Sequence, residues 1–121
     1  MAARQTGVIL VDDSPYESAL TYLALTRTTP SVTHVPDLRS AARVARGAQL
    51  AILGPRAMSR VSHHQLRALG IPAVGIGVRL SNADRRRAFD AGVRAVYDRP
   101  RDWKAYLALI ASVVELATRR D

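Results

Sequence analysis

The chain alternates short apolar runs with longer segments in which apolar residues recur every three or four positions. Short apolar runs are typical of strands buried on both faces, and the three-to-four-residue repeat is typical of helices that cover such strands. We predict five strands, one in each of the segments 7–13, 31–35, 49–53, 71–78 and 93–98. The segment 31–35 is the least apolar of these, so we expect it near an edge of the sheet.

Helix signals separate the predicted strands. Ser62 and Gln65 have the spacing of a capping box, and Gly70 stands where a glycine commonly ends a helix. We predict a loop over 54–61, directly before this helix. The five helices that we predict cover segments 14–27, 37–47, 62–70, 81–92 and 102–120.

The first and last helices have their own start signals. Ser14 precedes Pro15 and stands three residues before Glu17, which is the arrangement of an N-cap, a first-turn proline and a capping-box acid. Asp102 precedes the longest apolar-periodic segment and is the expected N-cap there.

A strand followed by a helix, five times over and with short connections, predicts a parallel sheet with helices on both faces. The carboxyl ends of parallel strands share one rim, and ligands gather there in proteins of this architecture. We therefore expect five residues at or just beyond strand ends to crowd that rim: Asp12, Asp13, Gly54, Gly77 and Arg99.

Composition narrows the class of protein further. A length of 121 residues with 48% hydrophobic content suits one folded domain, which we place at 1–121. No apolar run is long enough to span a membrane and the start MAARQTG does not read as a signal peptide, so we expect a cytoplasmic protein. The absence of cysteine excludes disulfides, thiolate chemistry and Cys-based zinc sites.

The net charge of +8 permits nucleic-acid or acidic-protein partners. An Ala- and Arg-rich chain is also what a GC-rich genome tends to produce, so the charge alone does not identify a partner. The sequence has no helix-turn-helix pattern, no aromatic stacking platform and no zinc site, so direct nucleic-acid binding is not expected.

The order of these signals resembles the receiver domain of two-component response regulators over essentially the whole chain. The acidic pair Asp12 and Asp13 follows the first strand, and the segment 71–100 matches the family without a gap, including its Ile-Pro entry, its Ala-Gly helix stop and Pro100. The resemblance implies a flavodoxin-like α/β fold, a doubly wound five-stranded parallel sheet of strand order 2-1-3-4-5 with five helices.

The same resemblance implies that the phosphorylation site is degenerate. In that family the acidic pair binds Mg²⁺, but here the phosphoacceptor position falls on Gly54, the hydroxyl position on Gly77 and the lysine position on Arg99. Glycine has no nucleophile, so no acyl phosphate can form there. The aromatic switch position falls on Val96, and Tyr97 should point to the opposite face because strand side chains alternate.

Four expectations follow for the rim. We expect no catalytic residue, no cofactor and no bound metal, since a magnesium site usually needs more than one carboxylate and the third is missing. We expect Arg99 to pair with Asp12 or Asp13 in place of the cation, because a guanidinium fork matches a carboxylate. The alternative is that both aspartates are merely solvated.

A second candidate region is the basic run of the fourth helix. In receiver domains the surface formed by the fourth helix, fifth strand and fifth helix is the usual dimerisation and output face. A solvated helix face is the common alternative for such a run. The residues that we place on an interaction face are Arg85, Arg86, Arg87, Tyr97, Trp103 and Tyr106.

These observations predict a pseudo-receiver, a phosphorylation-independent module that binds a protein partner or a second copy in bacterial signalling or transcription control. The chain ends where response regulators often continue into a DNA-binding domain, so we expect that such a domain could follow. The alternative is a sensing module that binds a small anion or metabolite at the vacated rim, beside Arg99 and Arg56. An enzyme is not expected.

Overall fold

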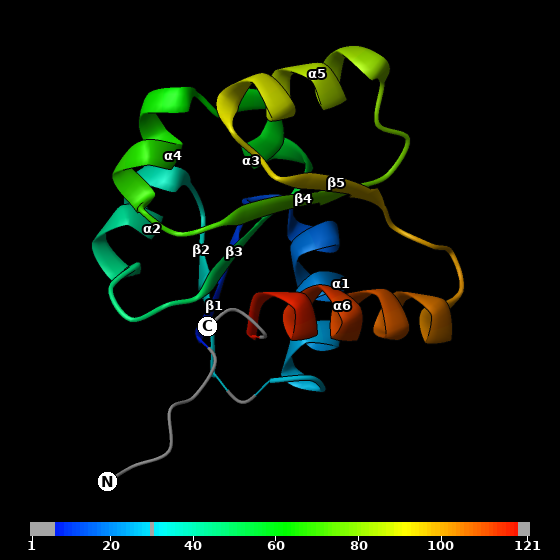
Figure 1. The fold of residues 1–121 in the computed structure, drawn as a ribbon. Coiled ribbons are helices and arrows are strands. Elements are labelled where there is room, and N and C mark those ends of the chain that lie inside the picture. The colour runs from blue at the N-terminus through cyan, green and yellow to red at the C-terminus, as the bar shows by residue number, and fades with distance from the viewer. Residues whose placement is uncertain (1–6, 30, 119–121) are drawn as a thin grey trace, which may run out of the picture.

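A computed structural model of the chain describes residues 7–29 and 31–118. It contains one parallel sheet in the order β2-β1-β3-β4-β5, the flavodoxin-like topology (Figure 1). The strands are β1 (Gly7–Val11), β2 (Ser31–Val35), β3 (Leu50–Leu53), β4 (Ala73–Gly77) and β5 (Ala95–Asp98). The predicted strand order is confirmed, and β2 lies at an edge as its weaker apolar pattern suggested.

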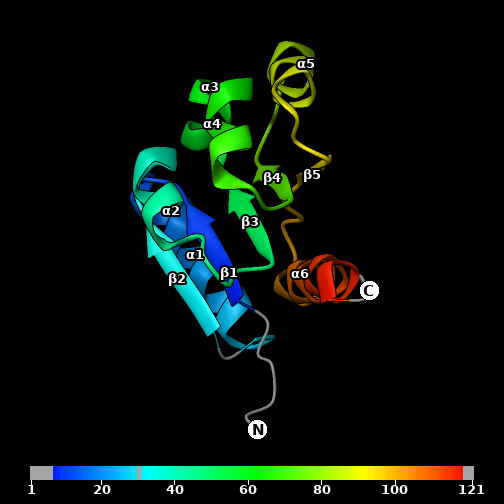
Figure 2. The ribbon, with the colours of Figure 1, turned by 60° about the vertical axis from the view of Figure 1, so that its left-hand side comes forward.

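Helices cover the sheet on both faces, as Figures 1 and 2 show. The helices are α1 (Pro15–Thr26), α2 (Leu38–Val44), α3 (Pro55–Arg60), α4 (His63–Leu69), α5 (Asn82–Ala91) and α6 (Trp103–Thr118). One face carries α1 and α6, and the other carries α2, α3, α4 and α5. None of the helices in the described residues is long and apolar enough to cross a membrane.

The alternation of side chains along the strands divides the core into two layers. In β1, Val8 and Leu10 pack toward α1 and α6, while Ile9 and Val11 pack toward the four other helices. All four are almost fully buried, as expected of a central strand covered on both faces.

The prediction of five helices is wrong by one, because α3 (Pro55–Arg60) lies inside the segment that we assigned to a loop. Gly54 is the N-cap and Pro55 the first helical residue, a position that suits proline because it needs no N–H there. Ala57 and Met58 are the buried residues of this helix. Six residues are too few to show a helical repeat in the sequence.

The predicted ends of α4 and the predicted start of α6 are confirmed. α2 ends at Val44, before the predicted stop at Gly47, and the predicted end of the last helix at 120 lies outside the described residues. α4 begins with the Ser62–Gln65 capping box and ends on Gly70 in the left-handed conformation. The carboxylate of Asp102 accepts a hydrogen bond from the backbone N–H of Ala105 at 2.9 Å, so it caps α6. These ends are set by local hydrogen bonds, which a sequence pattern captures well.

The start of α1 differs from the prediction. Ser14 is the N-cap residue, but its side chain makes no capping hydrogen bond. Glu17 is not part of a capping box and instead binds Arg99 from the far end of β5. A long-range ion pair therefore replaces the local contact that the spacing suggested.

Candidate functional site

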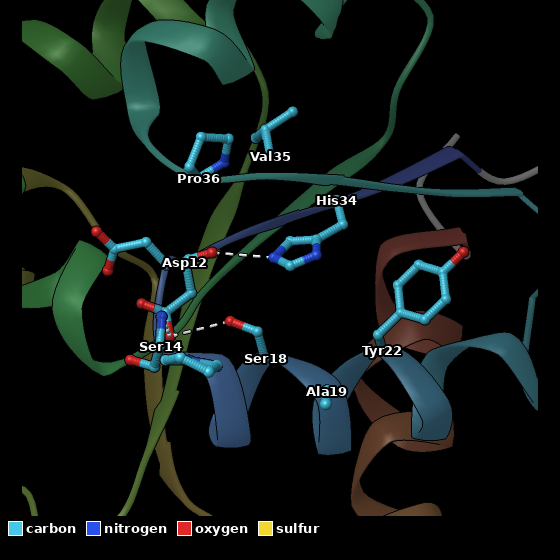
Figure 3. A pocket seen from close by; sticks show the side chains of 10 residues that line it. Asp12, Ser14, Ser18, Ala19, Tyr22, His34, Val35 and Pro36 are labelled. Carbon is cyan, nitrogen blue, oxygen red and sulfur yellow. Dashed lines mark hydrogen bonds between the residues drawn. The ribbon is translucent and has the colours of Figure 1, made fainter.

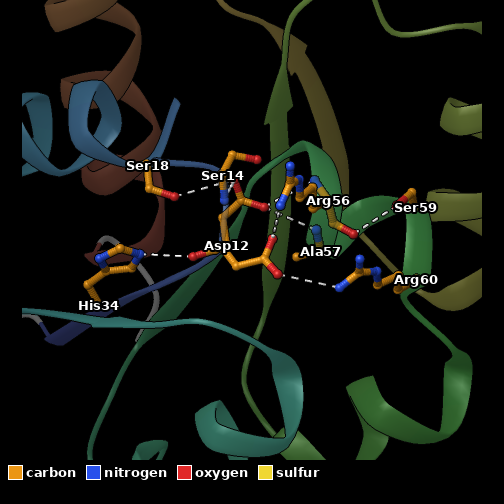
Figure 4. A network of polar contacts seen from close by, with 9 residues as sticks. Asp12, Ser14, Ser18, His34, Arg56, Ala57, Ser59 and Arg60 are labelled. Carbon is orange, nitrogen blue, oxygen red and sulfur yellow. Dashed lines mark hydrogen bonds and ion pairs between the residues drawn. The ribbon is translucent and has the colours of Figure 1, made fainter. Parts of the chain in front are cut away.

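The rim at the carboxyl ends of the strands is organised by the side chain of Asp12, which directly follows β1. Its side chain is buried, and Oδ1 accepts hydrogen bonds from the backbone N–H groups of Arg56 at 3.0 Å and Ala57 at 3.1 Å. Oδ2 accepts from the backbone N–H of Ser14 at 3.3 Å and from the hydroxyl of Ser18 at 3.4 Å (Figure 4). Both carboxylate oxygens of Asp12 are therefore held by the protein itself.

The two bonds to Arg56 and Ala57 are those of a helix cap. These residues occupy the second and third positions of α3, where an N-cap side chain normally accepts N–H groups that have no partner within the helix. The actual N-cap residue is Gly54, which has no side chain to offer. Asp12 thus caps α3 from the neighbouring strand.

Position 54 needs glycine because there is no room for a side chain, and not because of its backbone angles. Its φ of −78° and ψ of −177° are open to any residue. A Cβ at this position would lie 2.3 Å from Cγ and 2.4 Å from Oδ2 of Asp12. The carboxylate of Asp12 therefore fills the space into which a side chain at position 54 would extend.

Asp13, unlike Asp12, faces solvent and has basic neighbours. Its side chain is 36% exposed, and its two oxygens each lie 3.5 Å from a guanidinium nitrogen, one of Arg56 and one of Arg60. Exposed ion pairs of this length contribute little to stability. They do place two positive charges beside the carboxylate.

The acidic pair does not fit the magnesium ion that the receiver resemblance implies. Mg²⁺ needs several hard oxygen ligands in octahedral geometry. Asp12 uses both oxygens to bind N–H and O–H groups, Gly54 supplies no carboxylate, and two arginines flank Asp13. Within residues 7–29 and 31–118, no three acidic, imidazole or thiol side chains gather in a metal-binding arrangement.

Gly77 and Arg99 also meet at this rim, as predicted. The backbone N–H of Arg99 donates to the carbonyl oxygen of Gly77 at 2.8 Å. A Cβ on Gly77 would lie 2.7 Å from Cδ2 of Leu80, so Leu80 covers the place where a hydroxyl-bearing side chain would stand. Gly54 and Gly77 therefore both border side chains that occupy their space.

The prediction that Arg99 pairs with Asp12 or Asp13 is wrong. Nε and Nη2 of Arg99 bind the two oxygens of Glu17 at 2.9 and 3.0 Å, a bidentate pair that is mostly buried. This hydrogen bonding with Glu17 holds the pKa of Arg99 above its ordinary value, although burial opposes the effect. Arg99 thereby joins the end of β5 to α1, and its charge does not neutralise Asp12 or Asp13.

The same cluster extends to Tyr106 of α6. Its hydroxyl lies 2.6 Å from Oγ1 of Thr21, and the guanidinium of Arg99 lies 5.9 Å from its ring centroid. Since Thr21 donates its only hydroxyl hydrogen to the carbonyl oxygen of Glu17, Tyr106 is the donor in this contact. Burial raises the pKa of Tyr106 above its ordinary value.

Tyr106 cannot belong to a surface. Its side chain is only 1% exposed, so its assignment to an interaction face is wrong. The helical repeat of the last helix could not distinguish the residues that pack on the sheet from those that face outward, because nearly every turn carries an apolar residue on more than one side.

The basic run of α5 divides between two surroundings. Arg85 reaches β5, where its Nη2 lies 2.5 Å from Oδ2 of Asp98. Arg86 and Arg87 are exposed and line a hollow beside Val61, at the end of α3. The three arginines therefore do not share one surface.

Val96 and Tyr97 lie on opposite faces of β5, as the alternation predicted. Val96 packs with the α5 side of the core and Tyr97 with the α6 side. Tyr97 is partly buried, and Trp103 at the start of α6 is 36% exposed.

A cavity of about 480 Å³ opens beside the rim, between α1 and the end of β2 (Figure 3). Ser18, Ala19 and Tyr22 form its α1 side, and His34 stands opposite them. Nε2 of His34 is 2.9 Å from the carbonyl oxygen of Asp12. This cavity includes neither Arg56 nor Arg99, so it differs from the anion site that we considered beside those arginines.

Sequence reasoning missed three contributors to the rim: Ser18, Glu17 as the partner of Arg99, and α3 as the element that Asp12 caps. Pro55 directly after Gly54 is a helix-start signal that could have revealed α3. The ion pair between Glu17 and Arg99 joins positions 82 residues apart, and no local pattern marks it.

Comparison with solved structures identifies the fold independently. The phosphorylated cyanobacterial phytochrome response regulator RcpA superposes with a TM-score of 0.70 at 18% sequence identity, covering 96% of this chain and 95% of its own. A response regulator from Hahella chejuensis gives 0.65 at 19%, with 93% and 95% covered. A response regulator protein from Burkholderia multivorans gives 0.60 at 23%, with 90% and 94% covered.

The chain therefore has the fold of response-regulator receiver domains over nearly its full length. No family model matches the sequence, and no curated protein matches it either. At these identities the likeness concerns the fold alone.

We predict that Asp12 and Gly54 are energetically coupled. Gly54→Ala should destabilise the protein by about 2 kcal/mol because the new Cβ overlaps the carboxylate. Asp12→Gly should cost about 2 kcal/mol through the lost cap and the flexible backbone. Together they should cost less than the sum by about 1 kcal/mol or more, measured by urea denaturation of all four proteins.

The matched control for this cycle is Asp12→Asn with Gly54→Ala. Asparagine keeps the volume of the side chain, so its combination with Gly54→Ala should show no relief. Strict additivity of Asp12→Gly and Gly54→Ala would contradict the steric account.

We also predict a pH-dependent contribution from Tyr106. Its pKa is raised in the folded protein, so the protonated phenol stabilises the fold fully below the ordinary tyrosine pKa of 10.0, and this contribution declines as the pH rises above that value. Tyr106→Phe should lose about 1 kcal/mol at pH 8, and its difference from the wild type should narrow toward pH 11.

Denaturation midpoints across this pH range provide the measurement. Tyr16→Phe is the control, because it makes the same substitution at a tyrosine that is 68% exposed. A constant difference between wild type and Tyr106→Phe at all pH values would refute the linkage.

Proposed function

We propose that the chain is a signalling module with the receiver fold that works without being phosphorylated and acts by binding a protein partner, a second copy of itself being the first candidate. The observation that carries the proposal is the position of Asp12, whose carboxylate fills the space beside Gly54 and caps α3. We infer no enzymatic activity for the chain.

The chemistry of the rim supports the absence of phosphotransfer. An acyl phosphate requires a carboxylate nucleophile and a cation that neutralises the incoming phosphoryl oxygens. At this rim the strand-end position is Gly54, and Asp12 is enclosed by four hydrogen-bond donors. The guanidinium of Arg99 is paired with the carboxylate of Glu17.

The permanent contacts of the rim also bear on signalling. In a switch, a ligand shifts the population of two states only through contacts that differ between them. Here the contacts around Asp12 and Arg99 are made by the protein's own groups. We infer a single constitutive conformation, regulated through the presence of its partner.

The surface that we propose for the partner surrounds β5. This strand lies at an edge of the sheet, between α5 and α6 (Figure 2). Phe89 on α5 is 49% exposed and Leu116 on α6 is 59% exposed. An apolar groove of about 170 Å³ is lined in part by Tyr97 and Val113. Exposed apolar groups around an unpaired edge are typical of interaction surfaces.

Incubation with acetyl phosphate and Mg²⁺, followed by intact-mass measurement, tests the phosphorylation-independent part of the proposal. We expect no phosphoryl adduct on the wild type. Gly54→Asp should also remain unmodified, because Asp12 occupies the space that the new carboxylate would need. A receiver domain that accepts phosphate from acetyl phosphate serves as the positive control in the same reaction.

An adduct on an aspartate of the wild-type chain would overturn the proposal. An adduct on Gly54→Asp alone would show that Asp12 yields its place more easily than the contacts indicate, and it would contradict the steric part of the argument.

Sedimentation velocity over a range of concentrations tests the interaction face. We expect reversible dimers of the wild type and a dissociation constant about tenfold weaker for Phe89→Ser, which removes an exposed apolar ring on α5. Tyr16→Ser is the matched control, since Tyr16 is an exposed ring on α1. A wild type that stays monomeric at millimolar concentration would reject self-association through this face.

A further inference from the structure

A second surface of the molecule lies between α4 and α5, away from the strand ends. Two hollows of about 380 and 450 Å³ adjoin each other there, because His63 and Ala91 line both. One extends to the loop at Gly70, before β4, and the other to the N-terminal half of α5 at Ala83. We call the two hollows together the α4–α5 groove.

Arginines line both hollows of this groove. Arg67 and Arg94 line the first hollow, and Arg86 and Arg87 line the second. All four are exposed, and none takes part in the ion pairs found in the described part of the chain, which engage Arg56, Arg60, Arg85 and Arg99.

The groove contains little negative charge to balance these arginines. Asp90 is the only acidic residue among its lining residues, where four arginines and His63 are present. Charges of one sign along a concave surface concentrate the electrostatic field and attract a ligand of opposite charge. The excess here is positive.

Apolar groups line both hollows beside the arginines. An occupant therefore has to combine acidic groups with apolar side chains. The apolar lining residues include Val61, Leu66, Ile71, Pro72, Ala83 and Ala91.

The length of the groove suits a short stretch of extended chain. It follows α5 from Ala83 to Ala91, which is about 12 Å at 1.5 Å per residue. An extended peptide rises about 3.3 Å per residue, so roughly four residues span the groove.

We propose that the α4–α5 groove binds a short extended segment of a partner protein that carries acidic residues at both ends and apolar residues between them. Carboxylates match the forked geometry of arginine guanidinium groups, and side chains of the middle residues contact the apolar lining.

A nucleic-acid strand suits the groove less well. Such a strand carries a phosphate at every nucleotide, and Asp90 would lie against it. The lining contains no Tyr, Phe or Trp on which a base could stack. The groove also lies on a different side of α5 from Arg85 and β5, so this proposal does not depend on the interaction face around β5.

Fluorescence anisotropy with a labelled peptide Asp-Glu-Leu-Val-Glu-Asp tests the proposal. We expect saturable binding to the wild type and no binding of the uncharged analogue Asn-Gln-Leu-Val-Gln-Asn. Arg67→Ala with Arg94→Ala, and separately Arg86→Ala with Arg87→Ala, should each weaken binding by about fivefold or more.

The matched control is Arg27→Ala with Arg101→Ala, which removes the same charge from two exposed arginines, at the end of α1 and just before α6. It should change the affinity by less than about twofold. Equal weakening by the control pair would show unspecific attraction to a basic protein and overturn the proposal.

Two further outcomes would also overturn it. One is the absence of peptide binding to the wild type. The other is tighter binding of a labelled oligothymidylate that depends on the same four arginines, since this would assign the groove to nucleic acid. Backbone amide shifts on peptide titration should concentrate in 63–71 and 83–94, and a spread over the whole chain would contradict the location.

Discussion

The rim of this molecule depends on one buried carboxylate. Asp12 leaves the end of β1 and accepts the N–H groups at the start of α3, which no residue of that helix could satisfy because its N-cap is a glycine. The same side chain also binds the backbone and the hydroxyl at the start of α1. A single carboxylate therefore holds the beginnings of two helices on opposite faces of the sheet.

The other charges of the rim are balanced within the protein as well. Glu17 engages Arg99 through both oxygens, and Tyr106 completes the cluster from α6. This joins α1, the end of β5 and α6, three elements that meet only in the folded state. A bidentate pair of low exposure has defined geometry, so it fixes where these elements lie relative to one another.

Local signals allowed much of the fold to be predicted. Apolar runs located every strand, and the Ser62–Gln65 capping box and Gly70 located the two ends of α4, because hydrogen bonds between near neighbours set them. α3 was missed because a six-residue helix shows no repeat. The sequence also indicated that Asp12, Gly54 and Arg99 lie at the same rim.

Local sequence patterns could not predict which charged side chains pair at the rim. Asp12, Asp13 and Arg99 were correctly predicted to lie at one edge of the sheet. The partner of Arg99 was not predicted, because it is Glu17, whose spacing from Ser14 fitted a capping box equally well. The run of arginines in α5 separated because one helix turns successive side chains by about 100°, so Arg85 reaches β5 while Arg86 and Arg87 face the α4–α5 groove.

The contact between Asp12 and Gly54 has a consequence for the history of this chain. A side chain gained at position 54 meets an occupied space, and a side chain lost at position 12 leaves a helix start without its acceptor. Whichever of the two substitutions comes first, the protein that carries it alone is less stable. The glycine is in this sense entrenched, because a larger residue is accommodated at position 54 only when position 12 changes with it.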